Sequence, residues 1–239
     1  MSTTQILWDN WNKYDNLDSV MRQGFLKIKA YGYKKGIEEM LQRYHSESTL
    51  IHSGRVAMLF SDMMDLWPAY YEGVDKYIAL KVALNHDIGE LVVGDICDDG
   101  REEHEDKKGP EWDAVVSHYS NLDERTCQDC KDIHQQFDEA NTFLGQSIRL
   151  ADKLDFLAKL IKMEGQGFQL NNKKFYSSND WALAREIDSY KFVDIVGNHL
   201  RHLINDCNFD QRLVQIATGF IACGLHSINR PFFEWWQPH

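Results

Sequence analysis

The sequence is poor in the features that mark several classes of protein. Only 4 of its 239 residues are proline and 15 are glycine, which is few for a sandwich or barrel built on tight turns. No segment approaches the roughly 18 consecutive apolar residues of a membrane-spanning helix. The first twenty residues lack an apolar run with a basic lead, so they do not resemble a signal peptide. We therefore expect a cytoplasmic protein with no membrane partner.

Positive charge and cysteine are also scarce. The chain has 26 basic and 37 acidic residues, for a formal net charge of −11. Nothing supplies the positive field that broad binding to nucleic acid polymers or anionic membranes requires. The five cysteines are odd in number, which favours reduced thiols over a disulfide framework. An anionic small-molecule substrate would need local cations, either basic side chains or a metal.

Apolar residues recur with helical periodicity along almost the whole chain. The pattern predicts an all-α protein with a single domain over residues 1–239. We expect its core over about 35–165, with an N-terminal helix and a C-terminal helical extension. Val92-Val93 is the one segment that suggests a strand, and it is too short to build on. The expected helices cover residues 17–30, 36–44, 48–66, 74–91, 110–120, 132–163, 179–206 and 209–227, with loops over 94–109 and 165–180.

Four side chains that bind metals well occur among apolar neighbours. His86 and Asp87 are adjacent on a predicted helix, His52 lies on the apolar face of another, and Asp152 follows Leu150 and Ala151. A buried histidine or aspartate is costly unless it is paired or metal-bound. Imidazole and carboxylate suit a divalent transition metal such as Mn, Co, Fe, Ni or Zn. The combination indicates one ion with positions open for water or substrate.

The pattern resembles the HD-domain metal-dependent phosphohydrolase superfamily. The signature of that superfamily is a His, a His-Asp pair and a distant Asp on helices around one metal. Three segments narrow the resemblance to the 5'-deoxynucleotidase group. They read Glu-Ser-Thr-Leu-Ile-His from residue 47, His-Asp-Ile-Gly-Glu-Leu-Val-Val-Gly-Asp from residue 86, and Ala-Asp-Lys-Leu from residue 151. The implied fold is an HD-domain helical bundle with additional C-terminal helices.

The resemblance also implies roles for individual residues. His52, the His-Asp pair and Asp152 would bind the metal, and Glu90 and Asp95 would be catalytic. Glu90 is about one helical turn after the His-Asp pair, so it can orient or deprotonate a water that attacks phosphorus. Asp95 can protonate the leaving sugar oxygen. The group carries an arginine upstream of the first histidine, commonly beside a tryptophan, and here Lys35 and Arg43 are the candidates for binding phosphate.

The predicted activity is hydrolysis of (deoxy)nucleoside 5'-monophosphates to nucleoside and phosphate. A homodimer is expected from the aromatic C-terminal segment and from the habit of the family. Three alternatives stay open. One is a nucleoside triphosphate (tri/pyro)phosphohydrolase, another is a di-iron HD-type oxygenase that uses His118 and His134, and the third is a non-catalytic metal-binding regulatory module.

Overall fold

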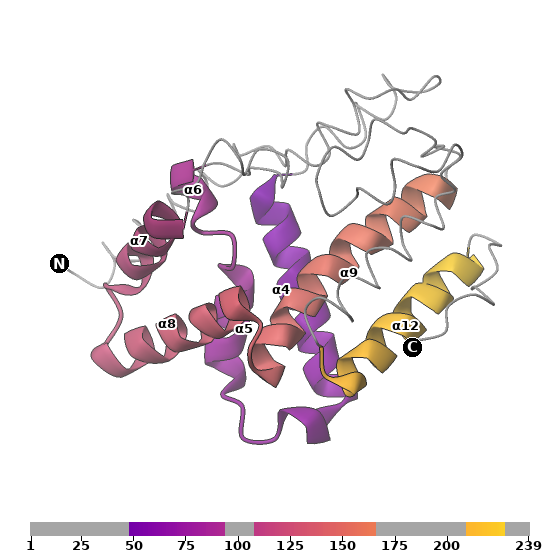
Figure 1. Cartoon of the computed structure of the whole chain (residues 1–239), viewed down its shortest axis with the longest axis horizontal. Coiled ribbons are helices and arrows are strands. Elements are labelled where there is room, and N and C mark those ends of the chain that lie inside the picture. The colour runs from indigo at the N-terminus through magenta and orange to yellow at the C-terminus, as the bar shows by residue number, and fades with distance from the viewer. Residues whose placement is uncertain (1–47, 94–107, 166–208, 228–239) are drawn as a thin grey trace.

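The computed structural model describes residues 48–93, 108–165 and 209–227 (Figure 1). These ranges contain helices and no β-strand, which confirms the predicted all-α class. None of the described helices has the length and apolar character needed to cross a membrane. The helices are α4 (Thr49–Leu66), the 3-10 helix η1 (Pro68–Tyr71), α5 (Lys76–Leu84), α6 (Glu90–Val93), α7 (Lys108–Tyr119), α8 (Glu124–Glu139), α9 (Phe143–Gly165) and α12 (Gln211–Ser227).

Three of the predicted helices match the structure closely, because α4, α7 and α12 occupy the expected ranges. Val92 and Val93 belong to α6 and form no strand. Two predicted helices are wrong, since the ranges 74–91 and 132–163 each contain a break. The other expected elements lie wholly or largely outside the described residues: the helices over 17–30, 36–44 and 179–206, and the loops over 94–109 and 165–180.

The first break separates α5 from α6. The side-chain amide of Asn85 donates to the Lys81 carbonyl over 2.6 Å, and the His86 ring nitrogen Nδ1 lies 2.8 Å from the Ala83 carbonyl oxygen. These side chains form hydrogen bonds with carbonyl groups of the last helical turn. Such carbonyls receive no hydrogen bond from a backbone N–H once the helix has ended. The helix therefore ends at Leu84, and the His-Asp pair lies in a turn rather than on the helix that the periodicity predicted.

The second break separates α8 from α9. Ala140 has a left-handed backbone with φ of 48°, which ends α8. The Thr142 hydroxyl accepts a hydrogen bond from the Gly145 backbone N–H over 3.1 Å and caps the start of α9. A Cβ atom at Gly145 would overlap the carbonyl group of Gln136. The glycine therefore lets the two helices approach closely at the corner.

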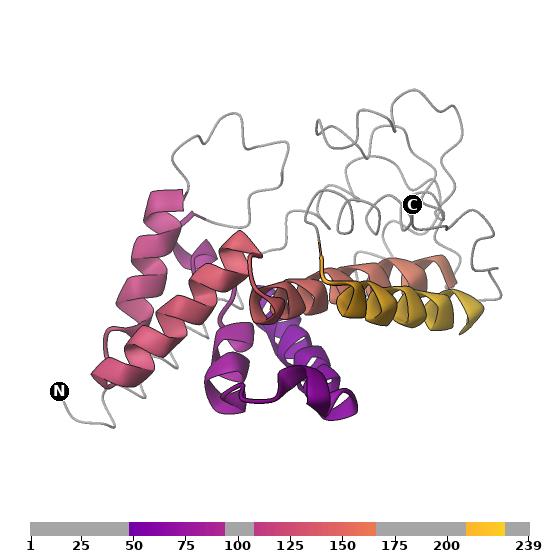
Figure 2. The same cartoon turned by 60° about the horizontal axis from the view of Figure 1, so that its bottom comes forward.

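The core forms where α4 and α9 meet. The helix α4 packs against α5 and α9, while α9 also packs against α8 and α12. Figure 2 shows α12 running alongside α9. The buried residues of α4 recur at intervals of three and four, as expected for one face of a helix. Large fully buried side chains of this core include Phe60, Met64, Leu150, Leu154 and Leu157.

Candidate metal centre

The predicted metal ligands come together from three elements. His52 lies on α4, His86 and Asp87 lie in the turn after α5, and Asp152 lies on α9. The first three each offer a ligand atom, and these atoms all lie within 4.8 Å of one another. Asp152 joins the group through an oxygen that is 3.1 Å from Nε2 of His52. Residues up to a hundred positions apart in the sequence therefore converge where α4, α9 and the turn meet.

Hydrogen bonds at Nδ1 orient both histidine rings. Nδ1 of His86 donates to the Ala83 carbonyl, since a carbonyl oxygen can only accept. Nδ1 of His52 lies 2.7 Å from Oδ2 of Asp155. Both rings are buried, and neither Nε2 atom has a hydrogen-bond partner among the described residues. Each Nε2 atom therefore presents a lone pair to the inside of the site.

The atoms that face these lone pairs are also acceptors. His52 Nε2 lies 3.1 Å from a carboxylate oxygen of Asp152, and His86 Nε2 lies 3.1 Å from one of Asp87. Two lone pairs at this separation repel each other unless they share a cation. Ligand atoms that bind one ion at 2.0–2.2 Å lie about 2.8 to 3.6 Å apart, the lower end for octahedral and the upper end for tetrahedral coordination. The donor set and its spacing therefore fit a divalent metal.

The site has an excess of negative charge. Burial alone would raise the pKa of Asp152, but Lys153, His52 and His86 outweigh it and hold that pKa well below its usual value. Burial lowers the pKa of His86, yet the Asp87 and Asp152 carboxylates outweigh burial and raise it. The raised pKa of His86 shows that the Asp87 and Asp152 carboxylates favour a positive charge beside them.

A half-buried ion pair that we did not anticipate adjoins the site. Asp155 is 4% exposed and accepts two hydrogen bonds from Arg55, from Nε over 2.6 Å and from Nη2 over 3.0 Å. Burial raises the pKa of Asp155, but His52 and Arg55 more than compensate and lower it. The sequence contained a signal for this pair. Arg55 follows His52, and Asp155 follows Asp152, at the spacing of one helical turn.

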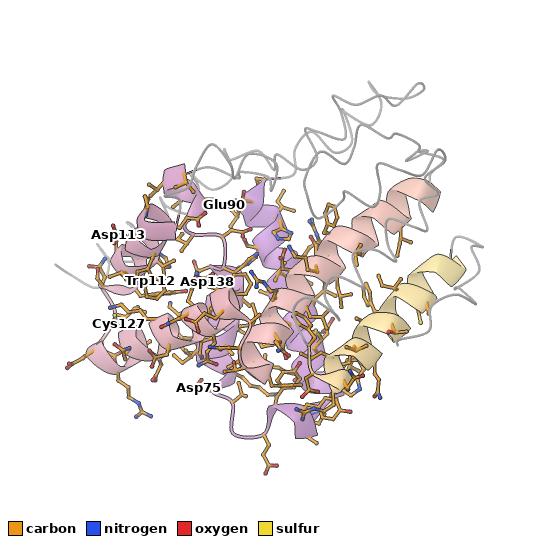
Figure 3. The ribbon with its side chains drawn as sticks, in the orientation of Figure 1. Asp75, Glu90, Trp112, Asp113, Cys127 and Asp138 are labelled. Carbon is orange, nitrogen blue, oxygen red and sulfur yellow. The ribbon has the colours of Figure 1, made fainter. Side chains whose placement is uncertain are left out.

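Glu90 is the first residue of α6. Its Oε2 atom accepts a hydrogen bond of 3.0 Å from the Thr49 hydroxyl, at the start of α4. Figure 3 accordingly shows Glu90 beside the N-terminal end of α4. The other residues predicted to act on the substrate, Asp95, Lys35 and Arg43, lie outside the described residues.

The profile of the HD domain matches residues 38–190, which is more than half of the chain. The chain belongs to the HD-domain family. This result confirms the superfamily that the motifs predicted. The match includes the site elements α4 and α9 and the turn that carries the His-Asp pair.

Individual relatives of this HD domain agree with that assignment. A protein of Dictyostelium discoideum named 5'-deoxynucleotidase HDDC2 is 28% identical over 129 residues, which cover 53% of this chain and 68% of the relative. A conserved hypothetical protein from Pyrococcus furiosus has a TM-score of 0.50 at 24% identity, and covers 68% of this chain and 87% of its own. A predicted metal-dependent phosphohydrolase from Magnetospirillum magnetotacticum has a TM-score of 0.53 at 16% identity, and covers 96% of both chains. The two solved structures show a shared fold.

Two further histidines of the HD domain lie beside the site and not in its ligand group. His118 on α7 and His134 on α8 are 3% and 2% exposed. Burial is the main cause that lowers the pKa of His134 to about 3, so this ring is neutral. The ring centroid of Phe137 is 5.4 Å from that of the proposed ligand His86 and 5.9 Å from that of His134. Among the described residues, the group that could hold one ion contains neither His118 nor His134.

Proposed function

We propose that this HD-domain protein hydrolyses the phosphomonoester of (deoxy)nucleoside 5'-monophosphates and releases nucleoside and phosphate. The observation that carries the proposal is the pair of buried Nε2 atoms, of His52 and His86, that face carboxylate oxygens. The nucleotide class is supported by the similarity to the protein named 5'-deoxynucleotidase. The resemblance of the motifs to the same group points the same way.

The proposed ligands come from α4, from the turn after α5 and from α9, and they are His52, His86, Asp87 and Asp152. Two imidazoles and two carboxylates suit a first-row divalent metal. Such an ion lowers the pKa of water and neutralises charge on the phosphoryl oxygens. The chain itself supplies the orientation of the two rings, through the hydrogen bonds that Nδ1 of each makes.

Glu90 is the proposed general base. Its carboxylate takes a proton from the water as the water oxygen attacks phosphorus, and the bond from phosphorus to the sugar oxygen breaks in line. The hydrogen bond from Thr49 fixes the Glu90 side chain for this task. Asp95 is the proposed general acid that protonates the leaving sugar oxygen, and Lys35 and Arg43 are the proposed cationic partners of the phosphate.

Phosphate release from a panel of nucleotides tests the proposal. The purified protein, loaded with Mn²⁺ or Co²⁺, is incubated with deoxynucleoside and ribonucleoside monophosphates, and free phosphate is measured with malachite green. We expect release from at least one monophosphate, and a loss of at least ~10² in rate for Glu90→Gln with the metal retained. The exposed Glu72 provides the matched control, because Glu72→Gln changes an acid in the loop before α5.

The same panel separates the proposed monophosphatase from the triphosphohydrolase alternative. Nucleoside triphosphates are included, and ion-exchange chromatography of the products distinguishes phosphate from pyrophosphate and triphosphate. Release of triphosphate would show that the protein is a triphosphohydrolase and not a monophosphatase. No release from any nucleotide, with the metal verified in the protein, would contradict the proposed function.

A further inference from the structure

We propose that Asp155 and Arg55 are positioning residues for the metal centre. They hold His52 as the tautomer that carries its proton on Nδ1, so that the Nε2 lone pair is directed at the metal. The inference rests on the proposed function to the extent that His52 is a metal ligand. It adds two residues to the site that act through His52 and are not among the proposed metal ligands.

The contact between Asp155 and His52 fixes the position of the proton. The two side chains are 4% and 2% exposed, and Oδ2 of Asp155 lies 2.7 Å from Nδ1 of His52. A carboxylate only accepts hydrogen bonds, so the proton lies on Nδ1. A partner of this kind sets the tautomer and ring orientation of a ligating histidine.

Arg55 determines how Asp155 presents its oxygens. Nε donates to Oδ1 over 2.6 Å and Nη2 donates to Oδ2 over 3.0 Å, which is a two-point contact. The guanidinium is planar and its donors form a rigid fork, so this contact fixes the plane of the carboxylate as well as its place. Oδ2, which also contacts His52, is thereby held toward the ring.

The pair also joins the two helices that carry ligands. Arg55 is three residues after His52 on α4, and Asp155 is three residues after Asp152 on α9. Side chains three apart on a helix lie on one face. The ion pair therefore holds His52 and Asp152 at the separation that the metal site requires.

His86 provides an internal comparison, because it achieves the same orientation without a side-chain partner. Its Nδ1 donates over 2.8 Å to the backbone carbonyl of Ala83, only three residues earlier. That bond belongs to the local turn and does not involve Asp155. Removal of the Asp155 carboxylate is therefore expected to change the tautomer of His52 and to leave that of His86 unchanged.

The tautomer can be read directly in the metal-free protein. Long-range ¹H–¹⁵N correlation spectra of the ¹⁵N-labelled full chain distinguish a proton on Nδ1 from one on Nε2, and His52→Gln assigns the ring. We expect the Nδ1 proton on His52 in the wild type and a mixture of tautomers in Asp155→Asn, whose amide offers either an oxygen or an NH₂ group. A wild-type His52 that carries its proton on Nε2 alone would overturn the proposal.

Metal affinity provides the second readout. Titration with Co²⁺, followed by its visible absorption, should show an affinity about 10- to 100-fold lower in Asp155→Asn. Asp210→Asn is the matched control, because Asp210 makes the same two-point contact with Arg212, at 2.9 and 2.8 Å, before α12. An affinity within about threefold of the wild type in folded Asp155→Asn would overturn the proposal. If Asp155→Asn does not fold, the tautomer of His52 in the wild type still tests the proposal.

These readouts separate the inference from the proposed function, because neither measures turnover. If the affinity for Co²⁺ depends on Asp155 but the protein releases phosphate from no nucleotide, the positioning role is supported and the proposed activity is contradicted. Conversely, if the protein releases phosphate but Asp155→Asn binds Co²⁺ as well as the wild type does, the proposed activity is supported and the positioning role is contradicted. Failure of the wild type to bind Co²⁺ or any other divalent metal contradicts both.

Discussion

The Thr49 hydroxyl donates a hydrogen bond to Glu90 over 3.0 Å, and so connects the first residue of α4 to the first residue of α6. Thr49 is fully buried and Glu90 is half-buried, so this bond is partly shielded from water. The two residues are 41 positions apart. The proposed base is therefore held by the same helix that carries the proposed ligand His52.

We predict that Thr49→Val lowers kcat by about fivefold, since one net hydrogen bond contributes about 1 kcal/mol and 1.36 kcal/mol corresponds to tenfold in rate. Valine keeps the shape of threonine and removes only the hydroxyl. The affinity for Co²⁺ should not change, because Thr49 is not a ligand. Steady-state kinetics with a monophosphate substrate measure the effect. Thr218→Val is the control, as the Thr218 hydroxyl donates to the Val214 carbonyl within α12. Equal kcat in Thr49→Val and wild type would show that the bond does not serve Glu90.

We predict that removal of the metal destabilises the protein and that His86→Ala abolishes this dependence. An ion bound only by the folded state adds about 2.7 kcal/mol of stability at a hundred times its Kd. EDTA should therefore lower the Tm of the wild type and of Glu90→Ala, and leave the Tm of His86→Ala unchanged. Differential scanning calorimetry, together with elemental analysis of each protein, checks this. If Glu90→Ala loses the metal as completely as His86→Ala, then Glu90 is a ligand and not the base.

The sequence predicted which four side chains come together better than it predicted their local structure. His52, His86, Asp87 and Asp152 were all named from motif and residue type, and the structure brings them together. The helix expected to carry the His-Asp pair ends before it, at Leu84. Periodicity could not reveal this end, because Leu84, Ile88 and Leu91 keep the helical spacing across the turn. The helix α5 ends where side chains form hydrogen bonds with its last carbonyl groups. Hydrophobic periodicity does not show such bonds.

The residues that sequence reasoning missed act through other residues. Asp155 contacts His52, Arg55 contacts Asp155, and no motif singled them out. Their spacing from the ligands was visible, but an acidic or basic residue at that spacing is usually a solvated surface group. Only the packing of α4 on α9 shows that Asp155 is buried. The break between α8 and α9 was missed for a similar reason, since its left-handed residue is Ala140 and not a glycine.

We predict that Gly145→Ala lowers the free energy of unfolding by about 1–3 kcal/mol, as overpacking of a tight contact does. The added Cβ would overlap the carbonyl group of Gln136 at the corner between α8 and α9, and backbone cannot move aside as a flexible side chain can. Gly219→Ala is the control, because nothing lies within 4 Å of its added Cβ on α12. There alanine should stabilise the helix by up to about 1 kcal/mol. Urea unfolding of both variants measures the difference, and destabilisation of equal size at the two sites would contradict the packing argument.

The last prediction concerns Cys130 on α8, whose side chain is fully buried. Burial raises the pKa of this thiol to about 11, although Lys81 opposes the shift. In the native state the Cys130 thiol therefore stays protonated at a pH where the same thiol in the unfolded chain, with an ordinary pKa near 8.5, is deprotonated. Since the native state then binds more protons than the unfolded state, stability falls as the pH rises from about 9 to 11.

Two measurements check this expectation. Iodoacetamide at pH 8 should modify the exposed Cys223 and leave Cys130 unmodified until the protein unfolds, as peptide mass spectrometry can show. In urea unfolding at pH 8 to 11, the wild type should lose more stability with rising pH than Cys130→Ala does, because alanine has no proton to lose. Other groups titrate in this range in both proteins, so only the difference between them reports on Cys130. The expectation is contradicted if stability depends on pH equally in the wild type and in Cys130→Ala, or if Cys130 is alkylated in the native protein. Either result would show that the Cys130 thiol can ionise in the folded state.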